Sequence, residues 1–254
     1  MTAEADLLDR AAAALAAARS AVAFTGAGMS TESGLPDFRS PTGLWAEFDP
    51  LEVATLSAFR RTPHRFYDFY RRRLALLAHA RPHAGHRALA RLEEAGRLRA
   101  VITQNVDGLH QAAGSRRVIE LHGNLREAAC PDCHWTGPIE VITAALDRGE
   151  LPSCPRCGRP VKPNVVLFEE LLPEQAYREA EELCAQADAV LVVGSSLQVT
   201  PAAWLPENAV RRGATLIIVN DEPTPLDHRA RVVLRGRAAA ILPALADRVL
   251  GPPS

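Results

Sequence analysis

The polar stretch TQNVDGLH at residues 103–110 follows a run of residues that should be buried. Ala100–Thr103 is apolar and β-branched, which predicts a strand. Gln104, Asn105 and Asp107 therefore lie where a strand ends, and open α/β sheets bind their ligands at that edge. Amides and a carboxylate can hydrogen-bond a ligand carboxamide that apolar side chains would leave unpaired. The alternative is that Asn105 or Asp107 only caps the following helix.

A second strand end carries an imidazole. His122 follows the apolar run Val118–Leu121 and precedes Gly123, so it can stand at the same sheet edge. An imidazole with an ordinary pKa of about 6.5 can accept a proton at neutral pH, which makes His122 a candidate general base. A lone histidine at a strand end is also commonly structural. We expect His110, in the coming helix, to pack or cap.

A glycine turn follows the first predicted strand, Ala21–Phe24. Gly26, Ala27 and Gly28 let backbone N–H groups approach a pyrophosphate, which indicates a dinucleotide site. The dehydrogenase fingerprint needs a further glycine where this chain has Thr31, so a hydride-transfer enzyme fits poorly. A tight turn without a ligand is the alternative.

The loop that continues from this turn is polar and glycine-rich. It reads GAGMSTESGLPDFRS over residues 26–40 and brings Asp37, Phe38 and Arg39 together. Such a segment is too irregular for a helix, and its composition suits a mobile lid. Residues 34–39 are the part expected to close.

Four cysteines form two Cys-x-x-Cys pairs: Cys130 with Cys133, and Cys154 with Cys157. Two such pairs supply the four thiolates of a closed structural zinc site, which leaves no position for a catalytic water. A redox Cys-x-x-Cys is the alternative chemistry. A zinc ribbon also allows a second class of function, a binding module without catalysis. Cys184 lies in a helical pattern and is expected to pack as a small apolar residue.

Strands and helices alternate along the chain, which predicts an α/β fold with a doubly wound, Rossmann-like parallel sheet. The predicted strands are Ala21–Phe24, Ala100–Thr103, Val118–Leu121, Val190–Gly194, Thr215–Asn220 and Val232–Leu234, and the helices include Ala84–Ala95, Pro173–Ala187, Ala202–Arg212 and Ala238–Val249. Two segments break the alternation. We expect a main domain of residues 1–40, 84–125 and 163–254, and a small lobe built from a helical insertion, 41–83, and a zinc-ribbon module, 126–162.

Composition narrows the possible partners. The 254 residues carry 29 basic and 30 acidic side chains, a formal net charge of −1, so no basic surface predicts nucleic-acid binding. No uncharged run approaches the ~18 residues that a membrane span needs, and the first residues lack a leader pattern. Paired thiols favour a metal site in a reducing compartment, so we expect a cytoplasmic protein without nucleic-acid or membrane partners.

The motifs together resemble those of the sirtuin family. GAGMSTESGLPDFR, TQNVDGLH, the His-Gly pair at 122–123, both cysteine pairs, GSS at 194–196 and VN at 219–220 occur in family order over almost the whole chain. The resemblance implies an NAD-dependent protein-lysine deacylase with one structural zinc. In that reaction the acyl-lysine oxygen attacks C1′ of NAD, nicotinamide leaves, and free lysine and O-acyl-ADP-ribose are formed. Protein ADP-ribosyltransfer is the alternative activity.

The resemblance also implies roles for individual residues. His122 would deprotonate a ribose hydroxyl, and Asn105 would act in catalysis as well as in nicotinamide binding. Phe38 would shield the site from water. The residues implied to bind NAD are Gly26, Ala27, Gly28, Asp37, Phe38, Arg39, Gln104, Asn105, Asp107, Gly194, Ser195, Ser196 and Asn220.

The implied peptide site lies in residues 162–170, where a substrate peptide would pair strand against strand through Val165, Val166 and Phe168. The usual family pattern is Phe-Gly-Glu, whereas this chain has Glu169 in place of the glycine. Whether Glu169 faces the peptide or the solvent is left open by the sequence.

The implied acyl pocket involves Tyr67 and Tyr70. Sirtuins that remove succinyl or malonyl groups carry a Tyr-x-x-Arg pair there, and the residue three after Tyr67 is Tyr70. We therefore expect an aromatic wall without a cation, and neutral acyl groups ahead of succinyl. Arg71 weakens this expectation because it shares a helical face with Tyr67. The oligomeric state is not predicted.

Overall fold

Six parallel strands form the main sheet of the computed structural model, which describes residues 3–251. Their order is β3-β2-β1-β7-β8-β9, and the chain reverses direction across the sheet between β1 and β7. Each strand begins and ends within one residue of the predicted one: β1 Ala21–Thr25, β2 Val101–Thr103, β3 Val118–Glu120, β7 Ala189–Val193, β8 Thr215–Val219 and β9 Val232–Leu234. The predicted doubly wound fold is confirmed.

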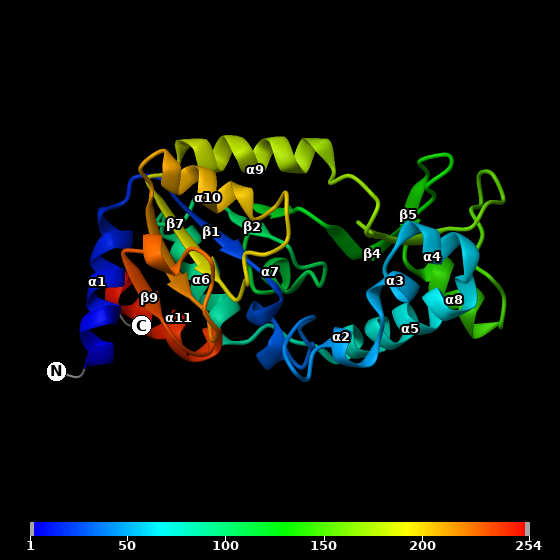
Figure 1. Cartoon of the computed structure of the whole chain (residues 1–254), viewed down its shortest axis with the longest axis horizontal. Coiled ribbons are helices and arrows are strands. Elements are labelled where there is room, and N and C mark those ends of the chain that lie inside the picture. Colours follow the sequence, from blue (N-terminus) through cyan, green and yellow to red (C-terminus); the bar gives the residue numbers. More distant parts are fainter. Residues whose placement is uncertain (1–2, 252–254) are drawn as a thin grey trace.

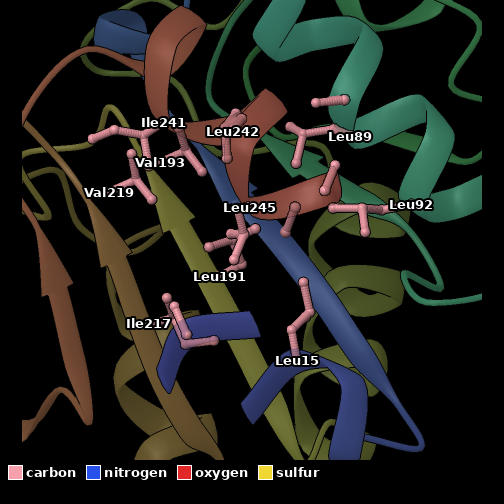
Figure 2. Close-up of a cluster of buried hydrophobic side chains, with 14 of the residues drawn as sticks. Leu15, Leu89, Leu92, Leu191, Val193, Ile217, Val219, Ile241, Leu242 and Leu245 are labelled. Carbon is pink, nitrogen blue, oxygen red and sulfur yellow. The ribbon is translucent and has the colours of Figure 1, made fainter. Parts of the chain in front are cut away.

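Alternation along the central strands divides the core into two layers. Ala23, Leu191 and Ile217 belong to one buried cluster, whereas Phe24 and Val190 belong to the other. Neighbouring residues of a strand point to opposite faces, so strands that are covered on both sides become apolar throughout. Figure 2 shows the first cluster, in which leucines of the covering helices meet the side chains of β7 and β8.

Helices cover both faces of the sheet. The longer ones are α1 (Ala3–Ala17), α6 (Ala84–Glu94), α9 (Glu174–Gln186), α10 (Trp204–Arg211) and α11 (Ala238–Leu250). α11 packs against α1 and α6 on one face, and α9 packs against α10 on the other. Gly85 lets α6 approach α11 closely, because an added Cβ would lie 2.8 Å from the Ala238 carbonyl oxygen. No helix within residues 3–251 is long and apolar enough to cross a membrane.

A smaller lobe extends from one end of the main sheet (Figure 1). It contains an antiparallel sheet in the order β5-β4-β6, which the sequence did not predict: β4 Gly123–Ala129, β5 Thr136–Pro138 and β6 Lys162–Val165. Its helices are α2 Leu44–Glu47, α3 Pro50–Val53, α4 Leu56–Arg61, α5 Pro63–His79 and α8 Glu140–Asp147. Short turns η1 Ala27–Met29, η2 Thr31–Ser33, α7 Leu109–Ala112 and η3 Asp227–Arg229 complete the chain.

α5 joins the two inserted segments of this lobe. Its aromatic side chains belong to one buried cluster with Ile142 and Val161 of the cysteine-bearing segment. The Tyr67 hydroxyl donates to the Val161 carbonyl at 2.6 Å, and Arg71 donates to the Leu146 carbonyl at 2.7 Å. The two segments therefore share one core, although the predicted domain boundaries stay a prediction.

Candidate active site and metal centre

At the carboxyl ends of β1 and β7, the two backbones approach so closely that no side chain fits between them. The Gly28 N–H donates to the Gly194 carbonyl at 2.9 Å. A Cβ added to Gly194 would lie 2.2 Å from the Met29 nitrogen, and one added to Gly26 would lie 2.8 Å from the Gly194 carbonyl oxygen. Gly194 also has a φ of +58°, which other residues rarely adopt. These glycines bring two backbone turns together where the strand order reverses, which is where open sheets bind ligands.

A chain of hydrogen bonds links the polar cluster after β2 to the glycine turn. The Asn105 amide donates to the Gly26 carbonyl at 3.0 Å and to Ser30 Oγ at 3.1 Å. Ser30 Oγ in turn donates to Asp107 Oδ2 at 2.7 Å. Both amide hydrogens of Asn105 are used, while its side-chain oxygen has no partner within residues 3–251. The oxygen is thus available to a ligand N–H.

Asp107 caps the following helix, as the alternative interpretation of the sequence expected, and it also lines the cavity. Its Oδ1 accepts from the Leu109 N–H at 2.9 Å, as a capping residue does, while Oδ2 accepts from Ser30. Burial raises the pKa of Asp107, and its hydrogen bonds oppose that rise. His110 is 1 % exposed and contacts Thr25 Oγ1 at 2.9 Å, as expected for a packed side chain.

His122 lies between β3 and β4, and its ring is oriented by the backbone. Its Nδ1 lies 3.0 Å from the Gln104 carbonyl oxygen. A carbonyl can only accept, so Nδ1 carries the proton and Nε2 keeps its lone pair. Burial lowers the pKa of His122, and the bond to Gln104 only partly offsets this effect. The imidazole is therefore neutral at pH 7 and able to accept a proton.

Residues of both lobes, including these polar groups, line one cavity of about 400 Å³. Among the residues singled out from the sequence, those that line it are Ala27, Phe38, Arg39, Tyr70, Gln104, Asn105, Asp107, His122, Val165, Val166, Phe168 and Glu169. The lining also includes Ser30, Leu77, Val106, Leu125 and Val199, which sequence reasoning missed. Ser30 lies in the glycine-rich loop, so its proximity to Asn105 was within reach of the sequence.

Several other expected residues lie outside this cavity. Gly26, Gly28, Gly194 and Ser195 form the turns beside it, and Ser195 Oγ donates to the Gln104 side-chain oxygen at 2.8 Å. That contact leaves the Gln104 amide hydrogens free to donate. Ser196 follows in the same turn.

Asp37, Asn220 and Tyr67 are also outside the cavity lining. Asp37 orders the lid, because its Oδ1 accepts from the backbone N–H groups of Arg39 and Ser40 at 3.1 and 2.9 Å. Asn220 follows β8, and its amide donates to the Glu222 carbonyl at 2.7 Å. Tyr67 is 2 % exposed and turns its hydroxyl toward the cysteine-bearing segment.

A cation lines the cavity, so the expectation of an aromatic wall without a cation is wrong. The cavity face of α5 presents Tyr70, Arg73 and Leu77. The Arg73 guanidinium carbon lies 5.2 Å from the Phe38 ring centre and 5.9 Å from that of Tyr70. Arg71 faces the Leu146 carbonyl instead. The i, i+3 spacing from Tyr70 to Arg73 was the signal in the sequence.

The backbone of residues 165–167 is held next to His122. The Val166 N–H donates to the His122 carbonyl at 2.9 Å. Lys162 is 5 % exposed, donates to the Val165 carbonyl at 2.6 Å and pairs with Glu170 at 3.1 Å. The Glu170 carboxylate also accepts from the Leu167 N–H at 2.8 Å. A buried ion pair thus fixes this segment from inside.

The four cysteines of the small lobe fit a zinc ion. Cys130 Sγ lies 3.6 Å from Cys157 Sγ, and the same distance separates the sulfurs of Cys133 and Cys154. All four sulfurs lie within 4.8 Å of one another. Zn–S bonds of about 2.3 Å in a tetrahedron place sulfurs about 3.8 Å apart, close to the observed separations. Four thiolates close the coordination shell, so the metal serves structure.

The chain is similar to known proteins over most of its length. The sequence profile of the Sir2 family matches residues 26–201. A Geobacillus kaustophilus protein, NAD-dependent protein deacetylase 1, is 53 % identical over 224 residues, which cover 88 % of this chain and 90 % of that protein.

Two of the similar solved structures contain a bound peptide. A Sir2 enzyme with a p53 peptide and NAD⁺ superimposes with a TM-score of 0.82 at 40 % identity, covering 94 % of this chain and 93 % of that one. Sir2Af2 bound to a myristoylated histone peptide has a TM-score of 0.80 and 42 % identity, covering 96 % and 97 %.

We predict one tightly bound zinc per chain, and Cys154→Ala should lose it together with the folding of the small lobe. Metal analysis and limited proteolysis of the purified variant measure both. Cys184→Ala is the matched control, because Cys184 is buried in the main core and lies outside the cluster. Wild-type protein without metal, or full zinc occupancy in Cys154→Ala, would contradict the assignment.

Proposed function

The chain belongs to the Sir2 family, and we propose that His122 is its general base, with Asn105 and Asp107 forming the nicotinamide pocket. The protein is an NAD-dependent protein deacylase. The observation that carries our assignment is the His122 ring itself, with Nδ1 donating to the Gln104 carbonyl and Nε2 free on the cavity side of the sheet edge.

NAD is consumed as a co-substrate in this reaction, which transfers the acyl group of a lysine to ADP-ribose and releases nicotinamide. His122 supplies the proton acceptor for a ribose hydroxyl, and its lowered pKa keeps it neutral for that task. Gln104 has free amide hydrogens with which to bond ribose oxygens, because its own oxygen is engaged by Ser195.

The carboxamide of nicotinamide carries N–H donors. These donors need hydrogen-bond acceptors in the nicotinamide pocket. The unpaired Asn105 oxygen and the buried Asp107 carboxylate are suited to accept from a carboxamide. Ala27 lines the same cavity. On the adenosine side we assign Gly26, Gly28, Gly194, Ser195, Ser196 and Asn220, whose turns follow β1, β7 and β8.

The lid protects the reacting bond from water. Phe38 packs on Trp45, with ring centres 5.1 Å apart, and receives the Arg73 guanidinium on its face. Asp37 and Arg39 belong to the same turn. We assign this cluster the role of excluding water while nicotinamide departs.

The substrate is an acyl-lysine segment of a protein. Val165, Val166 and Phe168 line the cavity on the segment beside His122, and a peptide added as a strand there would bring its lysine toward the base. Related Sir2 enzymes bind a p53 peptide and a myristoylated histone peptide. Because four reduced thiolates hold the zinc, we place the enzyme in a reducing compartment such as the cytoplasm.

The cavity is equipped for acidic as well as neutral acyl groups. Tyr70 and Arg73 both line it and have the Tyr-x-x-Arg spacing of sirtuins that remove succinyl or malonyl groups, so the Arg73 guanidinium can pair with a distal carboxylate. Burial raises the pKa of Tyr70 to about 12, so its phenol stays protonated. The relative that binds a myristoylated peptide supports longer neutral chains as well as acetyl.

His122→Ala should lower deacylation by about 10²- to 10⁴-fold, because the variant lacks the proton acceptor. Mass spectrometry of products from NAD and an acetyl-lysine peptide measures the loss of O-acetyl-ADP-ribose. In the wild type, kcat/KM should fall at acid pH with an apparent pKa below 6.5, since burial lowers the pKa of His122 and only the neutral ring accepts a proton. Wild-type turnover in the variant would remove His122 from the mechanism. ADP-ribosylated protein without deacylated peptide would favour the transferase activity.

Asn105→Ala should lose both NAD cleavage and inhibition by nicotinamide, because the variant lacks the acceptor oxygen in the proposed pocket. Nicotinamide titrations of residual activity measure the second effect. Asn208→Ala, at an exposed residue of α10 that does not line the cavity, is the comparison variant. Unchanged nicotinamide inhibition in Asn105→Ala would contradict the assignment.

On one peptide, we expect succinyl-lysine to be removed as well as acetyl- and butyryl-lysine. The physical reason is that the Arg73 guanidinium can pair with the distal carboxylate and offset its removal from water. Arg73→Met should lower kcat/KM for succinyl-lysine, whereas Arg71→Met, at a residue outside the cavity lining, should keep it. A wild type that removes acetyl but not succinyl groups, or unchanged succinyl turnover in Arg73→Met, would contradict this role of Arg73.

A further inference from the structure

The segment that follows β6 keeps part of its backbone open. The N–H groups of Val166 and Phe168 donate to the carbonyls of His122 and Ala54. Within residues 3–251, however, the Val166 carbonyl and the Glu169 N–H have no hydrogen-bond partner. An unpaired acceptor and an unpaired donor are what an added peptide strand can pair with. Residues 167–170 form a turn, because the Glu170 N–H donates to the Leu167 carbonyl at 3.1 Å, and Glu169 lies in that turn.

Glu169 is held in a conformation that a side chain rarely adopts. Its φ is +76°, in the left-handed region where glycine costs least. Its Oε2 accepts from the Ser57 N–H at 2.9 Å and from Ser57 Oγ at 2.8 Å, at the beginning of α4. Two hydrogen bonds across 112 residues offset the backbone cost and fix the direction of the carboxylate. Glu169 is thus neither a loose solvent-facing side chain nor a simple substitute for glycine.

The charge of Glu169 is not neutralised by the protein. Glu170, its neighbour, pairs with Lys162, but no cation lies within ion-pair distance of Glu169 in the described part of the chain. The cations that line the same cavity, Arg39 and Arg73, belong to the lid and to α5. Glu169 therefore places an exposed negative charge on the cavity rim, on the peptide side.

We propose that Glu169 selects acyl-lysine segments that carry an arginine or lysine beside the acylated residue. This inference rests on the proposed function, because it takes residues 165–169 as the peptide site. The rim beside Glu169 is apolar, with Phe168 46 % and Leu171 94 % exposed, so the partner combines a basic side chain with apolar neighbours. An exposed ion pair supports a preference of about two- to fivefold for basic over acidic flanks.

The test uses three acetyl-lysine peptides that differ only in flanking residues: arginine, glutamine or glutamate. Wild-type KM should rise in that order, and the ratio between the basic and acidic peptides should approach one at about 1 M salt, where exposed charges are screened. Glu169→Gln keeps an oxygen for Ser57 and loses the charge, so it should abolish the order. Glu169→Gly, which suits the left-handed backbone, should do the same. Glu174→Gln removes an exposed acid outside the cavity lining and should keep the wild-type order.

Fluorescence anisotropy with the labelled peptides tests the role of Glu169 separately from the proposed function, because it measures binding without turnover. Equal affinity for the three peptides in the wild type, or an unchanged order in Glu169→Gln, overturns the role of Glu169. Deacylation of the glutamine-flanked peptide tests the proposed function alone. If that peptide is deacylated and no charge preference is found, only the inference about Glu169 fails.

Discussion

The contact on which the site depends is the approach of two backbone turns at the switch point of the sheet. Gly28 donates to Gly194 in a space that excludes any Cβ, so the ends of β1 and β7 are fixed against each other. Asn105 then reaches the Gly26 carbonyl and Ser30, and Ser195 reaches Gln104. Each polar side chain takes its position from that backbone contact. A bulkier residue at Gly194 would displace groups on three strands at once.

Burial then sets the chemistry of the side chains that the turns position. The same removal from water raises the pKa of Asp107 and lowers that of His122, so burial disfavours the charged form of each, while the hydrogen bonds to Asp107 oppose the rise of its pKa. A neutral imidazole accepts a proton, while a carboxylate with both oxygens bonded stays in one orientation. Neither property requires a residue with unusual intrinsic chemistry. Both follow from burial in a cavity that α5 of the small lobe and the predicted lid, residues 34–39, also line.

The main sheet was predictable from the sequence because its strands are apolar on both faces, and the four cysteines were predictable because their spacing has few other uses. The antiparallel sheet of the small lobe was not, since β4 carries polar residues such as Arg126 and Glu127 and lacks a clear alternation. Arg73 was missed because either Tyr67 or Tyr70 could begin a Tyr-x-x-Arg pattern, and the helical phase of α5 decides that Tyr70 lines the cavity. The Ser57 contact of Glu169 joins residues far apart in sequence, so no local pattern could predict it.

The bond from the Val166 N–H to the His122 carbonyl has a consequence for how such enzymes diversify. It connects the proposed peptide segment to the proposed base through main-chain atoms alone. Side chains on that segment can therefore be exchanged over evolutionary time without disturbing the position of His122. A glutamate in place of the family's usual glycine at position 169 is one such exchange. Peptide preference can therefore differ between lineages while the catalytic groups stay the same.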